Sequence, residues 1–124
     1  NNYHDYNVVE EKHTLHGRID IYIYSLDPKK KFGIIIENKL FAHDQNRQLE
    51  RYYDFLTKDK QFDTQEMMIF YLTIDGRDPT PDSIDKKSLK SLKDNNEFRS
   101  ISYNEDIKNW LKDIMHLPNI WRRG

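Results

Sequence analysis

Two short runs of β-branched and aromatic residues, separated by a polar segment, constrain the fold of this sequence most. The runs are Ile19–Tyr24 and Phe32–Ile36, and their composition is typical of β-strands. The segment between them, Ser25–Lys31, holds turn-forming residues and a run of lysines. Two strands joined by a short polar loop predict an antiparallel hairpin. Because Ile34–Ile36 lacks polar alternation, we expect both faces of the second strand to be buried between helices.

Two carboxylates and a lysine interrupt these apolar strands. A turn centred between Pro28 and Lys29 would place Asp20 opposite Glu37, about 4.5–5.5 Å away, whereas a slip of one residue would turn one carboxylate to the other face. The strand period of two puts Lys39 on the face of Glu37. Charged groups in apolar surroundings are costly unless they are paired or bind metal. The group is therefore either a buried ion pair that serves packing or a site for a hard cation such as Mg²⁺ or Mn²⁺.

A helix is predicted directly after the hairpin. Its pattern covers residues 45–58, and Asp44 is suited to be its N-cap. The apolar stripe of this helix consists of Leu49, Tyr53 and Leu56. Gln48 and Tyr52 are four residues apart and share a neighbouring face with Gln45. The helix thus presents a polar ledge close to Lys39, unless these side chains are simply solvated.

The remaining pattern predicts an α/β domain around a small mixed sheet. Further strands are expected at Val8–His13, Met67–Thr73 and Phe98–Tyr103, and a short surface helix within 82–97. A last helix over 105–116, capped by Asn104, has an apolar face that we expect to pack in the core. That face consists of Ile107, Trp110, Leu111 and Ile114.

Length and composition limit the classes of protein. The 124 residues fit one domain, and no apolar stretch is long enough for a membrane span. Lys and Arg number 20 against 21 Asp and Glu, so the composition gives no support for a nucleic-acid partner, although a local basic groove is compatible with it. The absence of cysteine excludes disulfides and fits the reducing cytoplasm.

Three motifs in order resemble those of a known nuclease family. Gly17–Asp20 followed by Ile34–Lys39 resembles the G-R-x-D and E-x-K core of the PD-(D/E)XK nucleases. Gln48–Tyr52 resembles the Q-x-x-x-Y motif of the RecB-like branch of that superfamily. Later segments, including Tyr71–Thr73 and Ser102–Leu111, resemble a bacterial subfamily without an assigned function, so the resemblance covers about residues 8–115.

The resemblance implies a restriction-endonuclease-like core and a metal-dependent nuclease acting on nucleic acid, with DNA as the expected substrate. It gives catalytic roles to Asp20, Glu37 and Lys39. Mg²⁺ or Mn²⁺ would be bound by the first two side chains and by the backbone carbonyl of Asn38. Lys39 would orient the attacking water and stabilise charge on the phosphate. Substrate-positioning roles are implied for Gln45, Gln48 and Tyr52.

One departure from the family pattern leaves an alternative open. Members usually have a helix before the first core strand, and we expect this single domain, 1–124, to lack it. Glu10 or Glu11 is then a candidate for a further metal ligand. If the loss abolishes catalysis, the chain is an inactive nuclease-fold module that binds nucleic acid or a protein partner. The sequence leaves the oligomeric state open, a homodimer included.

Other polar residues near the motifs have weaker signals. His13 and His16 are three residues apart near Asp20, and His43 follows the second strand, but a zinc site would need further ligands that the sequence does not place. We expect instead that His16 or His43 lines the cleft. Arg18 is expected to point to the face opposite Asp20 and to pair with a carboxylate or touch phosphate.

Overall fold

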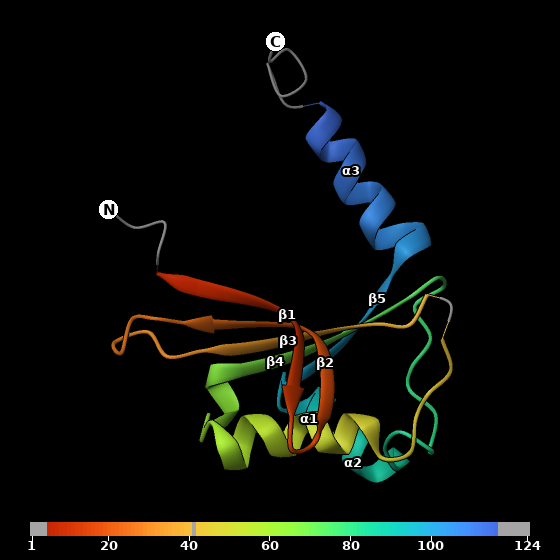
Figure 1. Ribbon diagram of the computed structural model, residues 1–124. Coiled ribbons are helices and arrows are strands. Elements are labelled where there is room, and N and C mark those ends of the chain that lie inside the picture. The colour runs from red at the N-terminus through yellow and green to blue at the C-terminus, as the bar shows by residue number, and fades with distance from the viewer. Residues whose placement is uncertain (1–4, 41, 117–124) are drawn as a thin grey trace.

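The computed structural model describes residues 5–40 and 42–116, and its centre is a mixed sheet with strand order β1-β2-β3-β4-β5 (Figure 1). The first three strands are antiparallel neighbours, and β3, β4 and β5 run parallel to one another. Their bounds are Tyr6–Thr14, Gly17–Ser25, Gly33–Asn38, Met67–Thr73 and Phe98–Ser102. The predicted α/β domain with a small mixed sheet is confirmed. The described residues before β2 form a strand and not a helix.

The β2–β3 hairpin has the register that the symmetry of its loop predicts. Ile21 pairs with Ile36, and Tyr24 pairs with Gly33, so the numbers of paired residues sum to 57 in both cases. One step beyond the last pair, the two strands carry Asp20 and Glu37. The register therefore brings the two carboxylates to the same end of the hairpin.

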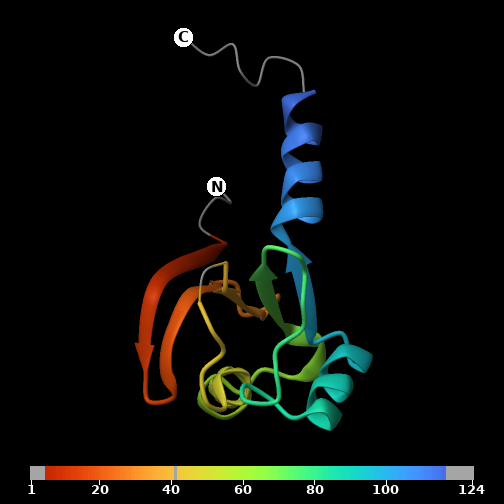
Figure 2. The ribbon, with the colours of Figure 1, turned by 90° about the vertical axis from the view of Figure 1, so that its right-hand side faces the viewer.

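The central strand β3 is buried on one face only, so the expectation of two buried faces is wrong. Ile35 is fully buried, whereas Ile34 and Ile36 on the other face remain partly exposed. Figures 1 and 2 show the reason, since α1 and α2 lie on the same side of the sheet. Glu37 shares the covered face with Ile35 and is therefore buried with it.

The helix that follows the hairpin begins later than its sequence pattern predicts. α1 spans Gln48–Asp54 and continues into a π-helical turn, η2, at Phe55–Asp59. Its N-cap is Arg47 in a left-handed conformation (φ 53°). The predicted cap, Asp44, instead accepts hydrogen bonds from Tyr71, Arg77 and Thr80. The short 3₁₀ turn η3 (Thr64–Glu66) leads into β4. Helix α2 (Lys86–Asp94) lies within the predicted range 82–97.

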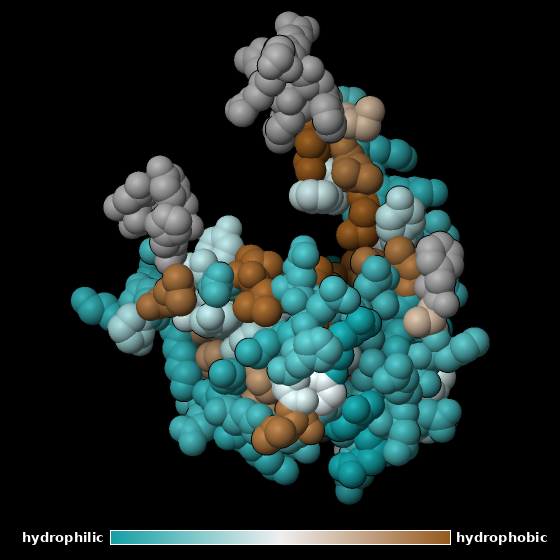
Figure 3. All heavy atoms as spheres, viewed as in Figure 1, coloured by the Kyte–Doolittle hydropathy of each residue, from teal (hydrophilic) through white to brown (hydrophobic). Residues whose placement is uncertain are grey.

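The last helix is the largest departure from prediction. Ser102, and not Asn104, caps the π-helical turn η4 (Tyr103–Ile107), from which α3 (Lys108–Met115) continues. The expected core residue Trp110 is 59% exposed. α3 extends away from the sheet (Figure 1), and Figure 3 shows apolar side chains along it. Within 5–40 and 42–116, every helix is too short or too polar for a membrane span.

Close packing around the hairpin predicts the effect of a single methyl group. A Cβ added at Gly33 would overlap the ring of Phe62, which is buried. We expect Gly33→Ala to lower the free energy of unfolding by about 1–3 kcal/mol, the usual cost of overpacking, measured by urea denaturation. Adding Phe62→Leu should recover part of the loss. Equal stability of Gly33→Ala and the wild type would contradict this packing.

Candidate active site

The C-terminal end of β3 and the neighbouring part of β2 bring two carboxylates and a lysine together. A carboxylate oxygen of Asp20, Oδ2, accepts a hydrogen bond from the backbone N–H of Asn38 at 2.9 Å. On the neighbouring strand, Glu37 Oε2 lies 3.3 Å from Lys39 Nζ. The side chains of Glu37 and Lys39 are 4% and 2% exposed, and that of Asp20 is 24% exposed. The constellation predicted from the hairpin therefore forms, with Asp20 on its solvent side.

The surroundings of Glu37 disfavour its charged form. Burial raises the pKa of Glu37 to about 7, and the negative charge of Asp20 adds to this shift. The hydrogen bond from Tyr52 and the charge of Lys39 act in the opposite direction but do not cancel it. Two carboxylates thus lie close together in a poorly solvated space, where burial outweighs the favourable contacts of Glu37.

Lys39 is fixed by its surroundings as well as by Glu37. Its backbone N–H donates to Leu72 O on β4 at 2.7 Å. At the other end of the side chain, Nζ donates to the carbonyl of His43 at 2.9 Å. The ammonium therefore has a defined position next to the carboxylates, which a flexible surface lysine would lack.

Gln48 and Tyr52 form a buried network that reaches Glu37. Gln48 Nε2 donates to the hydroxyl of Tyr52 at 3.0 Å, and that hydroxyl lies 2.9 Å from Glu37 Oε1 and 3.0 Å from the carbonyl of Arg18. Burial, then the charge of Glu37, raises the pKa of Tyr52 far above its ordinary value, so the phenol keeps its proton as a donor. The prediction that Tyr53 lies on the buried face of the helix and Tyr52 beside it is wrong. Tyr52 is 2% exposed and belongs to the core, whereas Tyr53 is only partly buried.

A cleft of about 230 Å³ unites these groups. Its lining includes every residue predicted for the site except the possible metal ligands Glu10 and Glu11, namely Asp20, Glu37, Asn38, Lys39, Gln45, Gln48 and Tyr52. Gln45 reaches the cleft from the exposed segment before α1 and not from the helix itself. The lining also includes Ala42 and two arginines that sequence reasoning did not assign to the site, Arg18 and Arg51.

The prediction for Arg18 is wrong because residues two apart in a strand share a face. Arg18 lies on the side of Asp20, with Nη2 at 3.5 Å from its Oδ1. Its Nη1 lies 3.0 Å from Glu11 Oε1, which confirms the expected pairing with a carboxylate. The two-residue spacing of Arg18 and Asp20 in the strand was therefore enough to predict that they share a face.

The other candidate ligands are not gathered at the cleft. Glu11 pairs with Arg18 and has a left-handed backbone (φ 50°), and Glu10 is not part of the cleft lining. His16 Nε2 lies 2.9 Å from Asp59, and His43 reaches the site only through its carbonyl. Over residues 5–40 and 42–116, no three His, Cys, Asp or Glu side chains are arranged to hold a metal ion. Any cation here would therefore take backbone and water oxygens besides the two carboxylates.

The residues present fit a hard divalent cation. Asp20 and Glu37 offer carboxylate oxygens only, which suit Mg²⁺ or Mn²⁺, and Mg²⁺ commonly retains several waters beside one or two carboxylates. In a strand the N–H and C=O of one residue point to the same side. Because the N–H of Asn38 points to Asp20, the carbonyl of Asn38 is directed to that side too. The pKa of Glu37 is raised first by burial and then by the charge of Asp20, so a cation bound beside it would stabilise its charged form.

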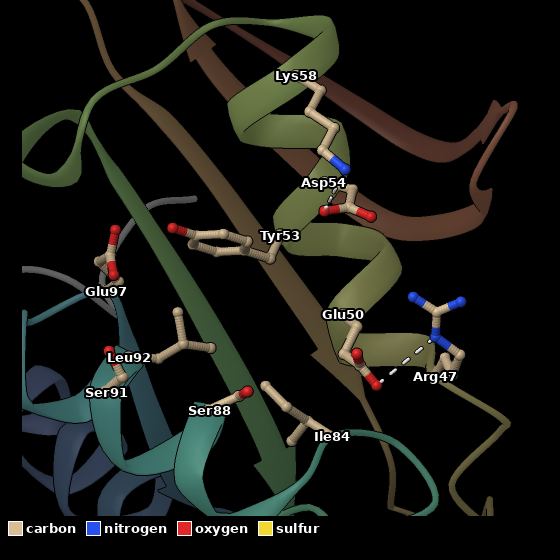
Figure 4. A pocket seen from close by; sticks show the side chains of 10 residues that line it. All are labelled: Arg47, Glu50, Tyr53, Asp54, Lys58, Ile84, Ser88, Ser91, Leu92 and Glu97. Carbon is tan, nitrogen blue, oxygen red and sulfur yellow. Dashed lines mark ion pairs between the residues drawn. The ribbon is translucent and has the colours of Figure 1, made fainter.

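A larger cavity, about 330 Å³, lies between α1 and α2 (Figure 4). Four of the residues that line it form ion pairs along α1 and η2, Arg47 with Glu50 and Lys58 with Asp54. No residue of the predicted constellation lines it. The smaller cleft at the strand ends is therefore the candidate active site.

Comparison with known proteins agrees with this arrangement. A family model described as the PD-(D/E)XK nuclease superfamily matches residues 1–120. The chain belongs to the PD-(D/E)XK nuclease superfamily. Its mixed sheet with helices is consistent with the restriction-endonuclease-like fold of that superfamily. Neither the curated proteins nor the solved structures include a match to this chain.

Membership in the PD-(D/E)XK superfamily carries a general expectation about chemistry. Its members are generally nucleases, they act on nucleic acid, and they typically use divalent metal ions. In this chain Asp20 lies within β2, Glu37 lies near the end of β3, and Lys39 directly follows β3, on the two neighbouring strands that the motifs predict.

Proposed function

We propose that this protein is a Mg²⁺- or Mn²⁺-dependent nuclease that hydrolyses phosphodiester bonds of DNA. The observation that carries the proposal is the convergence of Asp20, Glu37 and Lys39 in one cleft. Family membership supports the nuclease class. The absence of cysteine and the resemblance to a bacterial subfamily favour a bacterial, cytoplasmic enzyme.

Each residue of the cleft has a defined task under this proposal. Asp20, Glu37 and the carbonyl of Asn38 would hold the metal. When bound, the ion supplies Lewis-acid activation of the phosphodiester and of the attacking water. Lys39 orients that water and offsets negative charge that develops on the phosphate, because its ammonium is held within 3.3 Å of Glu37.

The helix and the segment before it prepare the site for substrate. Tyr52 fixes Glu37 through its hydroxyl, and Gln48 fixes that hydroxyl in turn. Such hydrogen bonds around a ligand set its orientation. Gln45 is exposed at the mouth of the cleft, where an amide can bind the sugar–phosphate backbone.

Titration of Mn²⁺ into the wild type and into Asp20→Asn, followed by a plasmid-cleavage assay, tests the proposal. We expect calorimetric Mn²⁺ binding and metal-dependent nicking by the wild type, and loss of both in Asp20→Asn. Asp113→Asn on α3, which removes the same charge from an exposed residue away from the cleft, should retain both. Wild-type protein that binds no Mn²⁺ would show that the carboxylates are structural.

A second candidate is a nuclease-fold module that binds nucleic acid or a protein partner without catalysis. It is favoured by the small acidic set, because no third acidic side chain joins Asp20 and Glu37 among the described residues. Such a module would bind its partner equally well in a chelator. Metal-independent binding of DNA without any nicking would establish it over the nuclease.

A further inference from the structure

Arg51 differs from the other charged side chains of the cleft. Those that line it are two carboxylates, one lysine and two arginines. Arg18 pairs with Asp20 at 3.5 Å, and Lys39 pairs with Glu37 at 3.3 Å. Within the part of the chain that the structure describes, Arg51 has no carboxylate within 4 Å. Its positive charge is therefore available to a ligand.

A neutral group holds this arginine in place. Nη1 of Arg51 donates to the carbonyl of His16, in the β1–β2 turn, at 3.1 Å. The neighbouring Gly17 has a φ of +116°, and a Cβ there would lie 2.7 Å from Nη1. The turn thus has room for the guanidinium because residue 17 has no side chain. This contact fixes the guanidinium and leaves its charge uncompensated.

The hydrogen-bonding capacity of Arg51 is only partly used. Its Nε is buried and has no hydrogen-bond partner among the described residues, and Nη1 makes the one side-chain bond to His16. A guanidinium carries five donors in a planar fork that matches two oxygens of one phosphate. Because Nε is buried, the donors open to a ligand are those of Nη1 and Nη2 that His16 does not use, and they suit an anion with two oxygen atoms.

Arg51 also lies where the cleft opens onto a second hollow. It lines the catalytic cleft together with Gln45, and the same two residues line an adjoining surface hollow with Asn46 and Arg47. This hollow has only amide and guanidinium side chains. A nucleic-acid backbone that spanned the cleft and this hollow would contact these donors.

We propose that Arg51 binds a phosphodiester group of the nucleic acid next to the one that is cleaved, and that the hollow lined by Gln45, Asn46 and Arg47 continues this backbone track. Arginine binds phosphate through paired N–H donors and is less strongly hydrated than lysine. The inference rests on the proposed function for its ligand, since the nuclease reaction is what brings a phosphodiester to the cleft. It adds a binding residue that contacts substrate outside the metal site.

The test compares Arg51→Gln and Arg51→Lys with the control Arg99→Gln, which removes an exposed arginine on β5, the opposite edge of the sheet. A labelled 12-nucleotide DNA is titrated with each protein at several salt concentrations in EDTA, and binding is followed by fluorescence anisotropy. The titrations are repeated with Mn²⁺ on proteins that also carry Lys39→Met. For Arg51→Gln we expect about tenfold weaker binding and a salt slope smaller by about 0.7–0.9, the value of one phosphate contact. Arg51→Lys should keep most of the slope.

The steady-state kinetics of DNA cleavage distinguish a phosphate-binding role of Arg51 from a purely structural one. We expect Arg51→Gln to raise KM about tenfold with a smaller change in kcat, and Arg51→Lys to recover part of that loss. A structural role would lower the melting temperature and leave the salt slope unchanged. If Arg51→Gln does not fold, the weaker affinity of Arg51→Lys, which keeps the charge but loses the fork, becomes the decisive comparison.

The outcomes for the two proposals are distinguishable. Equal salt slopes and KM for Arg51→Gln and Arg99→Gln would overturn the phosphate site, even if the enzyme cleaves DNA. A slope that depends on Arg51 in a protein that never cleaves would support the phosphate site and overturn the nuclease function. Wild-type protein that binds no oligonucleotide in either condition would overturn the phosphate site, and Mn²⁺ titration would then decide the metal site independently.

Discussion

Replacing Lys39 by methionine is expected to lower the rate of metal-dependent DNA cleavage by about 10²–10³-fold, the usual cost of removing one preorganised charge from an active site. Methionine fills a similar volume but offers no positive charge to the phosphate and no donor to the water. The measurement is single-turnover cleavage of a labelled duplex at saturating Mn²⁺. The loss should lie in the rate constant, because neither Asp20 nor Glu37 is altered.

The same substitution has a cost in stability that the assay must allow for. Lys39 pairs with Glu37 in a position where both side chains are at most 4% exposed, and removing one partner of a buried pair destabilises the fold. Saturating Mn²⁺ should offset this, since an ion that binds only the native state stabilises it. Lys90→Met, which breaks an exposed pair with Asp94 on α2, is the matched control. Cleavage by Lys39→Met at the wild-type rate in folded protein would show that the role given to Lys39 is wrong.

The hairpin and its site residues could be predicted because their determinants are local. Strand period, loop symmetry and the spacing of Asp20, Glu37 and Lys39 all lie within one short stretch of chain, so the register confirmed by the pairing of Ile21 with Ile36 needed no distant partner. The E-x-K and Q-x-x-x-Y motifs are also local. Their convergence in one cleft follows from where β3 ends and α1 begins.

The features that the sequence did not predict depend on distant partners. Arg51 is held by His16, 35 positions earlier in the sequence, and helical periodicity around Arg51 contains no sign of that contact. Tyr52 is buried in place of Tyr53, and its hydroxyl donates a hydrogen bond to Glu37. The spacing of apolar residues along the helix does not predict that hydrogen bond. Trp110 has the spacing of a core residue, but burial needs a covering element, and α3 extends away from the sheet.

Asp44 provides the largest stability effect that we predict. The sequence suggested a helix N-cap, but its carboxylate, 3% exposed, instead accepts hydrogen bonds from the backbone N–H of Thr80 at 2.7 Å, from Arg77 Nη1 at 3.1 Å and from the hydroxyl of Tyr71. Removing it leaves Arg77, which is 36% exposed, the hydroxyl of Tyr71 and the N–H of Thr80 without this acceptor. We expect Asp44→Ala to lower the free energy of unfolding by about 2–4 kcal/mol at pH 7, or the melting temperature by roughly 10–20 °C.

The pH dependence of this loss follows from the direction of the pKa shift. Burial alone would raise the pKa of Asp44, but hydrogen bonds from Thr80 and Arg77 outweigh it and lower the pKa below its ordinary value. The folded protein therefore binds this proton more weakly than the unfolded chain. Stability from Asp44 is fully present above the unfolded pKa, about 3.9, and is lost as the pH falls through the lower, folded value. The difference between wild type and Asp44→Ala should accordingly shrink below about pH 4.

The hydrogen bonds of Asp44 should also affect the proposed catalysis, because both sequence neighbours of Asp44 contribute to the candidate active site. His43 supplies the carbonyl that holds Lys39, and Gln45 lines the cleft. Chemical denaturation at pH 7 and at pH 3 measures the stability difference, with Asp94→Ala, an exposed carboxylate of α2, as the control of equal charge. Asp44→Ala below its melting temperature should fold, bind Mn²⁺ and cleave more slowly than wild type, because Lys39 is held less firmly. A stability difference that stays constant from pH 7 to pH 3 would mean that the carboxylate charge contributes nothing, and unchanged cleavage would separate this segment from the active site.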